Sequence, residues 1–137
     1  MEVTTEDVQL AFELRELYTI TRNWECNLRF KAEETATLKK QITALMRSGL
    51  IQEQRDRAQS ILFMIDRITF GISKLKDSLP AHLNMLEYLI SGAGSYFTVD
   101  LIENHARLKG RNDAIFLLFL EAKSEIRLLC EPEAARV

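Results

Sequence analysis

The chain has 137 residues, of which 47% are hydrophobic and 28% are charged, and its net charge at pH 7 is −2. This length and composition are typical of one globular domain with a real core, and they exclude a disordered chain. Because the net charge is slightly negative, no overall basic field is present to hold nucleic acid or an anionic membrane. Five glycines and two prolines leave few turn positions, which favours long helices.

The cysteine content and the apolar runs indicate the compartment. Cys26 and Cys130 are too few for a disulfide framework, and their spacing matches no metal motif. The chain opens without a secretory signal pattern, and its longest apolar run, residues 114–120, is too short to span a bilayer. We therefore expect a cytoplasmic protein with no membrane partner and no cofactor.

The first predicted helix covers residues 5–48. Thr4 or Thr5 offers a capping hydroxyl with acidic residues after it, and Ser48-Gly49 provides the stop. Apolar positions inside this helix alternate steps of three and four residues, which is the seam pattern of a coiled coil. The predicted seam is Leu10, Leu14, Leu17, Thr21, Trp24, Leu28, Lys31, Thr35, Leu38, Ile42 and Leu45.

The second predicted helix covers residues 50–91 and contains Pro80, which removes an amide hydrogen and crowds the preceding turn. Its seam keeps the same phase on both sides of the proline, which favours one helix kinked at Pro80. A true turn at Leu79-Pro80, giving four helices in the chain, is the alternative. The seam is Ile51, Gln54, Ala58, Ile61, Ile65, Ile68, Ile72, Leu75, Leu79, His82, Leu86 and Leu89.

The last predicted helix covers residues 98–130. A turn at Ser91–Ser95 precedes it, Thr98 caps it, and Glu131-Pro132 ends it, so that the tail 131–137 is expected to be mobile. The seam is Leu101, His105, Leu108, Asn112, Ile115, Phe119, Ala122, Ile126 and Leu129.

Three helices joined by two tight turns predict an all-α, antiparallel up-down-up three-helix bundle that forms a single domain over residues 1–137. Because the last helix is shorter, counting from the turns predicts that it ends near the level of residues 58–60. The tip of the hairpin, roughly residues 39–58, would then project as two helices. This tip is basic, and its candidate interface residues are Lys39, Arg47 and Arg55.

One resemblance covers most of the chain. It is carried by Leu17-Tyr18, by Trp24, by the run His105-Ala-Arg-Leu-Lys, and by Phe116, Lys123, Glu125 and Arg127. In these features the chain resembles a group of uncharacterised bacterial proteins, which are predicted to be long helical hairpins with a third helix. The resemblance implies the same architecture and no particular activity.

The two histidines, His82 and His105, both occupy seam positions and are expected at nearly the same level of the bundle. They can form a polar layer that fixes helix register. With a carboxylate from the level of Glu13 to Leu17 they could instead bind one metal ion, although the Glu-x-x-His motif of dinuclear bundles is missing. A third possibility is that the two rings do not meet.

The segment from His105 to Gly110 resembles the histidine phosphotransfer domain, a helical bundle whose phosphorylated histidine is closely followed by lysine and glycine. That family places the lysine three positions after an exposed histidine. Here Lys109 follows by four positions, and His105 is expected to face the core. No nucleophile, base and acid can be assembled from two histidines in these places, so no catalytic residue is predicted.

The apolar run Ala114–Leu120 is the strongest functional signal. A bundle helix buries about one stripe, so Phe116, Leu117 and Leu120 should be exposed unless something covers them. The run predicts self-association, most simply as a two-fold dimer, or binding of a helical protein partner. In the alternative, aromatic residues of the first helix (Tyr18, Trp24 and Phe30) cover the run. The predicted function is therefore that of a non-enzymatic structural or protein-interaction module.

Overall fold

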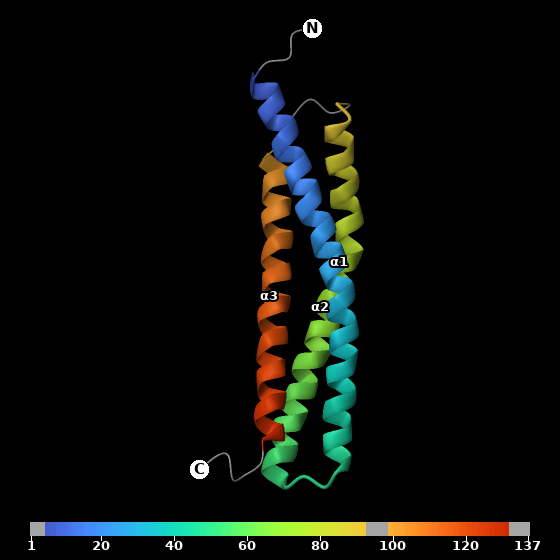
Figure 1. The fold of residues 1–137 in the computed structure, drawn as a ribbon, viewed down its shortest axis with the longest axis vertical. Helices are drawn as coiled ribbons and strands as arrows, with labels where there is room; N and C mark the ends of the chain where they lie inside the picture. Colours follow the sequence, from blue (N-terminus) through green and yellow to red (C-terminus); the bar gives the residue numbers. More distant parts are fainter. Residues whose placement is uncertain (1–4, 93–98, 132–137) are drawn as a thin grey trace. The chain divides into compact units, whose positions relative to one another are not determined.

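The computed structural model of the protein describes residues 5–92 and 99–131. Three antiparallel helices account for 94% of this part of the chain, and it contains no strand. They are α1 (Thr5–Arg47), α2 (Gln52–Ile90) and α3 (Val99–Cys130) (Figure 1). The predicted all-α three-helix bundle is confirmed. The predicted cap Thr98 and the predicted mobile tail, apart from Glu131, lie outside the described residues.

Pro80 lies inside α2, which continues for ten more residues to Ile90. The described residues therefore form three helices, and the alternative with a turn at Leu79-Pro80 is excluded. The seam keeps its phase across the proline, because Leu79 on one side and His82 on the other are both buried. Pro80 itself is exposed. A proline on the outer face leaves the packed side of the helix unbroken.

The chain divides into two compact units. Unit 1 comprises residues 1–29 and 74–112, and unit 2 comprises residues 30–73 and 113–137. Each unit contains a segment of all three helices. The two units are described separately below.

The predicted seams form the buried core. Every buried position of α1 and of α3 is a predicted seam position, and α2 adds one further residue, Leu83. The buried side chains are Leu14, Thr21, Trp24, Leu28, Thr35, Leu38 and Ile42 in α1; Ala58, Ile61, Ile65, Ile68, Ile72, Leu75, Leu79, His82, Leu83 and Leu86 in α2; and Leu101, Leu108, Ile115, Phe119, Ala122, Ile126 and Leu129 in α3. The two buried threonines satisfy their hydroxyls within α1, on the carbonyl four residues earlier.

The start of α2 differs from the prediction. Gly49 has a φ of +88°, which favours glycine, and the helix begins at Gln52 rather than near residue 50. Ile51 lies just before the helix and is 57% exposed, so it is not a seam residue. Its amide donates to Oε1 of Gln54 at 3.2 Å, as in the second half of a capping box. The weak seam predicted at Gln54 is therefore a helix cap.

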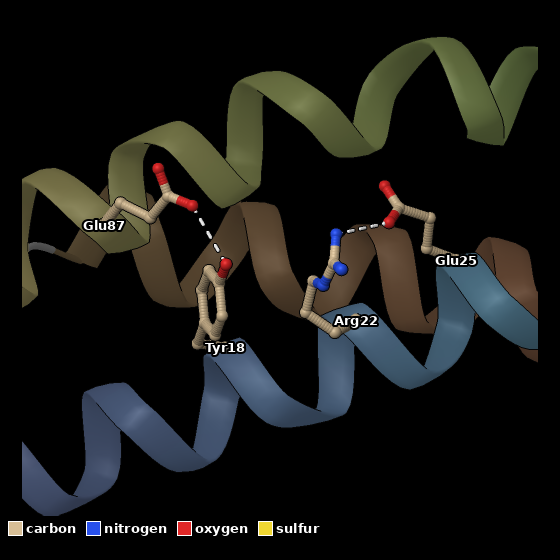
Figure 2. Close-up of polar contacts among 4 residues, drawn as sticks. All are labelled: Tyr18, Arg22, Glu25 and Glu87. Carbon is tan, nitrogen blue, oxygen red and sulfur yellow. Dashed lines mark hydrogen bonds and ion pairs between the residues drawn. The ribbon is translucent and has the colours of Figure 1, made fainter.

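In unit 1, Leu14, Leu86 and Leu101, one residue from each helix, form one buried hydrophobic cluster. Beside it, the hydroxyl of Tyr18 donates to Oε1 of Glu87 at 2.9 Å, which links α1 to α2. Figure 2 shows Tyr18 pointing across to Glu87, whereas Arg22, one turn further along α1, pairs with Glu25 of its own helix. The hydrogen bond to the Glu87 carboxylate raises the pKa of Tyr18, because the anionic tyrosine would face that negative charge.

In unit 2 three ion pairs mark the antiparallel alignment of the helices. Lys39 pairs with Asp66, Arg57 with Glu125, and Lys123 with Glu34, at N···O distances of 3.6, 3.7 and 3.9 Å. They are long, and their side chains are between 34% and 65% exposed, so they contribute little to the free energy of unfolding.

The level of α3 in unit 2 also differs from the prediction. Arg57 lies beside Glu125, five residues before the end of α3, and α3 flanks α1 as far as Leu45. The expected tip of only two helices is therefore shorter than residues 39–58. The count placed the end of α3 near the level of residues 58–60, whereas the pair of Arg57 with Glu125 puts the last five residues of α3 beyond that level.

Two glycines inside helices give a matched pair of stability predictions. A Cβ at Gly110 would meet nothing within 4 Å, whereas a Cβ at Gly71 would lie 3.1 Å from Cγ1 of Ile115. We expect Gly110→Ala to raise the free energy of unfolding by about 1 kcal/mol, because alanine is the better helix former. Gly71→Ala should gain less or lose stability. Urea denaturation measures both; an equal gain would contradict the close approach of α2 and α3 at Gly71.

Candidate functional site: a histidine pair and an exposed apolar face

His82 of α2 and His105 of α3 meet in unit 1. His82 is 2% exposed and His105 is half-buried, and Nε2 of His82 lies 2.9 Å from Nδ1 of His105. Of the three arrangements that the sequence left open, the structure shows the two rings in direct contact. Each ring can offer only one hydrogen to this contact, so one histidine donates and the other accepts.

Trp24, rather than a carboxylate, is the residue of α1 at this level. Its ring stacks on that of His105, with centroids 4.8 Å apart and an interplanar angle of 26°. The count from the Gly49 turn had placed Glu13 to Leu17 there, about one heptad away. Trp24 was a predicted seam residue, but its position beside His105 was missed because the count treated the connection between α1 and α2 as a symmetrical turn.

Asn104 and Arg107 complete a chain of hydrogen bonds that fixes both histidine tautomers. Nη2 of Arg107 lies 2.6 Å from Oδ1 of Asn104, and Nδ2 of Asn104 lies 3.1 Å from Nδ1 of His82. Because a guanidinium only donates, Oδ1 accepts and Nδ2 donates to His82. Nδ1 of His82 is then an acceptor, so its hydrogen is on Nε2 and is donated to His105. The remaining hydrogen of His105 is consequently on Nε2.

This arrangement favours neutral rings. Burial, followed by the neighbouring His105, lowers the pKa of His82 to about 4. Burial, followed by the charge of Lys109, lowers the pKa of His105 as well. The hydrogen bonds act in the same direction, since a proton added at Nδ1 of His82 would face the amide hydrogens of Asn104.

The geometry gives little support to metal binding or phosphotransfer. Within residues 5–92 and 99–131, no three His, Cys, Asp or Glu side chains are grouped to hold a metal ion. Phosphotransfer requires a nucleophilic nitrogen without a hydrogen, whereas the network places a hydrogen on Nε2 of His105 and uses its Nδ1 as an acceptor. The observed cluster therefore acts as a polar contact between α2 and α3.

The predicted interface residues of α3 are exposed in unit 2. Phe116, Leu117 and Leu120 are 43%, 65% and 45% exposed. Lys31, a predicted seam residue, places Nζ 4.4 Å from the centroid of the Phe116 ring and partly covers it. Of the aromatic residues that might have covered this run, Phe30 is itself 59% exposed. The run therefore presents an apolar surface.

Leu117 lies at a depression between α2 and α3, with a volume of about 420 Å³. The depression is lined by Arg67, Ala114, Ile115, Leu117, Leu118 and Glu121. Phe63 and Phe70 lie on the same face of α2 as Arg67, four residues before it and three after it. They are 68% and 64% exposed. We call this surface, defined by Phe63, Arg67, Phe70, Leu117 and Glu121, the α2/α3 face.

The predicted basic residues lie on two helices of unit 2. Lys39 and Arg47 line the outer surface of α1 together with Lys40, and Lys39 also pairs with Asp66. Arg55 is exposed in the first turns of α2. The sequence thus indicated the charged residues, but it gave no sign that α3 passes beside them.

Comparison with known proteins gives no match: no family model fits the sequence, and no curated protein or solved structure is significantly similar to it. The resemblance to bacterial helical hairpins stays a prediction. None of the helices in the described part of the chain has a stretch long and apolar enough to cross a membrane. The class that the fold itself defines is an all-α three-helix bundle.

Proposed function

We propose that the protein is a non-enzymatic interaction module that self-associates through the α2/α3 face of unit 2. The proposal is carried by three side chains that are each about two thirds exposed: Leu117 lines the depression, and Phe63 and Phe70 lie on the face of α2 that bears Arg67, the α2 residue lining it. A monomer in water would leave these large side chains hydrated, and contiguous apolar patches of this kind mark interfaces.

The charges of the α2/α3 face favour a second copy as the occupant. Arg67 and Glu121 both line the depression, so the surface carries one charge of each sign. In a two-fold dimer the same patch faces itself, and Arg67 of each copy can meet Glu121 of the other. We further propose a cytoplasmic location, where the exposed thiols of Cys26 and Cys130 would remain reduced.

Replacing Leu117 with glutamate tests the proposal. Light scattering should give twice the chain mass of 15.8 kDa for the wild type and the monomer mass for Leu117→Glu, because the variant buries an unpaired charge at the interface. Ile102→Glu, at a 49% exposed position of α3 in unit 1, is the matched control and should stay dimeric.

Charge reversal provides a second test of the same face. Arg67→Glu should weaken the dimer, and adding Glu121→Arg should restore it, since the reversed pair can again meet across the two-fold axis. A monomeric wild type, or a dimer that Leu117→Glu leaves unchanged, would contradict the proposal.

A further inference from the structure

A second surface of unit 2 has a different character from the α2/α3 face. A groove of about 850 Å³ lies between α1 and α3. Its apolar lining residues are Leu38, Ala44 and Leu45 from α1, and Leu120, Ile126 and Cys130 from α3. Leu38 and Ile126 are buried at its floor, whereas Leu120 is 45% exposed at its edge. The groove therefore offers an apolar base open to solvent.

The charges around this groove have one sign. Its other lining residues are Gln41, Lys123 and Arg127, and the adjoining surface of α1 adds Lys39, Lys40 and Arg47. Among residues 5–92 and 99–131, no carboxylate lines either surface. The nearest ion pairs, from Lys123 to Glu34 and from Lys39 to Asp66, are long and exposed, so they neutralise little of this charge.

The length of the groove suits a short helix. Its α1 wall runs from Leu38 to Leu45 and its α3 wall from Leu120 to Cys130, which at 1.5 Å per residue correspond to about 10 and 15 Å. Apolar side chains at positions i, i+3 or i+4, and i+7 of a partner helix span about 10 Å. Three anchors of one helix can therefore lie along the groove.

The apolar base of the groove favours a protein helix over other negatively charged partners. A nucleic-acid backbone could pair with the lysines and arginines, but it would leave Leu120 and Ile126 without apolar contacts. In a second copy, the large apolar side chains exposed on the acidic start of α1, over described residues 5–18, are Val8 and Phe12, which lie one turn apart. Neither occupant supplies three anchors.

We propose that the groove between α1 and α3 binds an amphipathic helix of another protein, with three apolar anchors and carboxylates on both flanks. The apolar anchors replace water over Leu45, Leu120 and Ile126. The flanking carboxylates meet Lys123 and Arg127 on one side and the α1 lysines on the other. This surface is separate from the α2/α3 face, so the two proposals can fail independently.

The test uses the full chain and a designed helical peptide of about 18 residues, with leucines at the three anchor positions and glutamates beside them. Fluorescence anisotropy should show saturable binding that weakens as salt is added. The same peptide with lysines in place of glutamates should bind at least roughly tenfold more weakly. Leu120→Glu, and separately the pair Lys123→Glu with Arg127→Glu, should each weaken binding of the glutamate peptide roughly tenfold.

Leu117→Glu is the control, because it alters the α2/α3 face and should leave peptide affinity unchanged while it abolishes self-association. Equal binding of the two peptides, or insensitivity to Leu120→Glu, would overturn the proposal. A single-stranded oligonucleotide that binds the groove as tightly would assign it to nucleic acid, and a peptide of residues 5–20 that does so would assign it to a second copy. Either outcome would overturn the proposal as well.

Discussion

The free energy of unfolding should fall by about 3 kcal/mol between pH 7.5 and pH 4 because of His82 alone. The pKa of this histidine is about 4 in the folded protein and about 6.5 in the unfolded chain. Between these values the unfolded chain binds more protons, so the stabilising contribution is fully present above pH 6.5 and is lost as the pH falls towards 4. His105, whose pKa is also lowered, acts in the same direction.

The polar and charged groups around the histidine pair support this direction of the pH dependence. From α3 the pair faces Asn104, which Arg107 holds, and the positive charge of Lys109; from α1 it faces the uncharged ring of Trp24. Asn104, Arg107 and Lys109 oppose an added proton, whereas the face of the Trp24 ring would favour one, but it stacks on His105 and not on His82. Denaturant melts at several pH values measure the effect, and His82→Gln should flatten the dependence between pH 6.5 and 4. Equal pH profiles for the two proteins would contradict the prediction.

Nitrogen NMR at neutral pH checks the structural basis directly. The network predicts that both imidazoles are neutral and carry their hydrogens on Nε2. Arg107→Ala releases the amide of Asn104, and we expect it to allow other tautomers while the helices stay intact. A hydrogen on Nδ1 of His82 in the wild type would show that the amide of Asn104 points the other way.

Replacing Pro80 with alanine should stabilise the protein by about 2 kcal/mol. α2 is continuous through an exposed Pro80, so alanine fits there and restores an amide hydrogen for the carbonyl of Lys76. Proline inside a helix costs about 3 kcal/mol relative to alanine, and about 1 kcal/mol of this is offset because proline also restricts the unfolded chain.

The matched control for this substitution is Lys76→Ala, which changes an exposed side chain one turn earlier and should alter stability by less than about 0.5 kcal/mol. Thermal and urea denaturation of the three proteins at pH 7.5 give the comparison. If Pro80→Ala destabilised the protein by 1 kcal/mol or more, the helix would not be continuous at this position.

The sequence predicted which positions are buried better than it predicted the contacts between helices. Burial repeats along one helix, so the seams, including Trp24 and Lys31, could be read directly from spacing. Ile51 was an exception, because the step of three that joins it to Gln54 also describes a helix cap. Leu83 was missed because it lies beside the seam.

Contacts between helices were harder to predict, because they depend on how each connection sets the level of the next helix. The contact between His82 and His105 agrees closely with the levels counted from the turn, since both residues are near the α2–α3 connection in sequence. The position of Trp24 disagrees with the count, because an error in the assumed α1–α2 connection shifts the expected level of every α1 residue by the same amount. Asn104 lies off the seam, and its only sequence signal was its position next to His105.

The hydrogen-bond network of His82, His105, Asn104 and Arg107 also defines a sequence pattern by which relatives can be recognised. Its residues lie at fixed spacings: Asn104 and His105 follow His82 by 22 and 23 positions, and Arg107 follows Asn104 by three. A seam alone is shared by countless unrelated bundles, whereas these three spacings are set by one geometry. A homologue that kept the geometry while its surface diverged would retain these four residues, with Asn104, His105 and Arg107 at the same spacings along one helix.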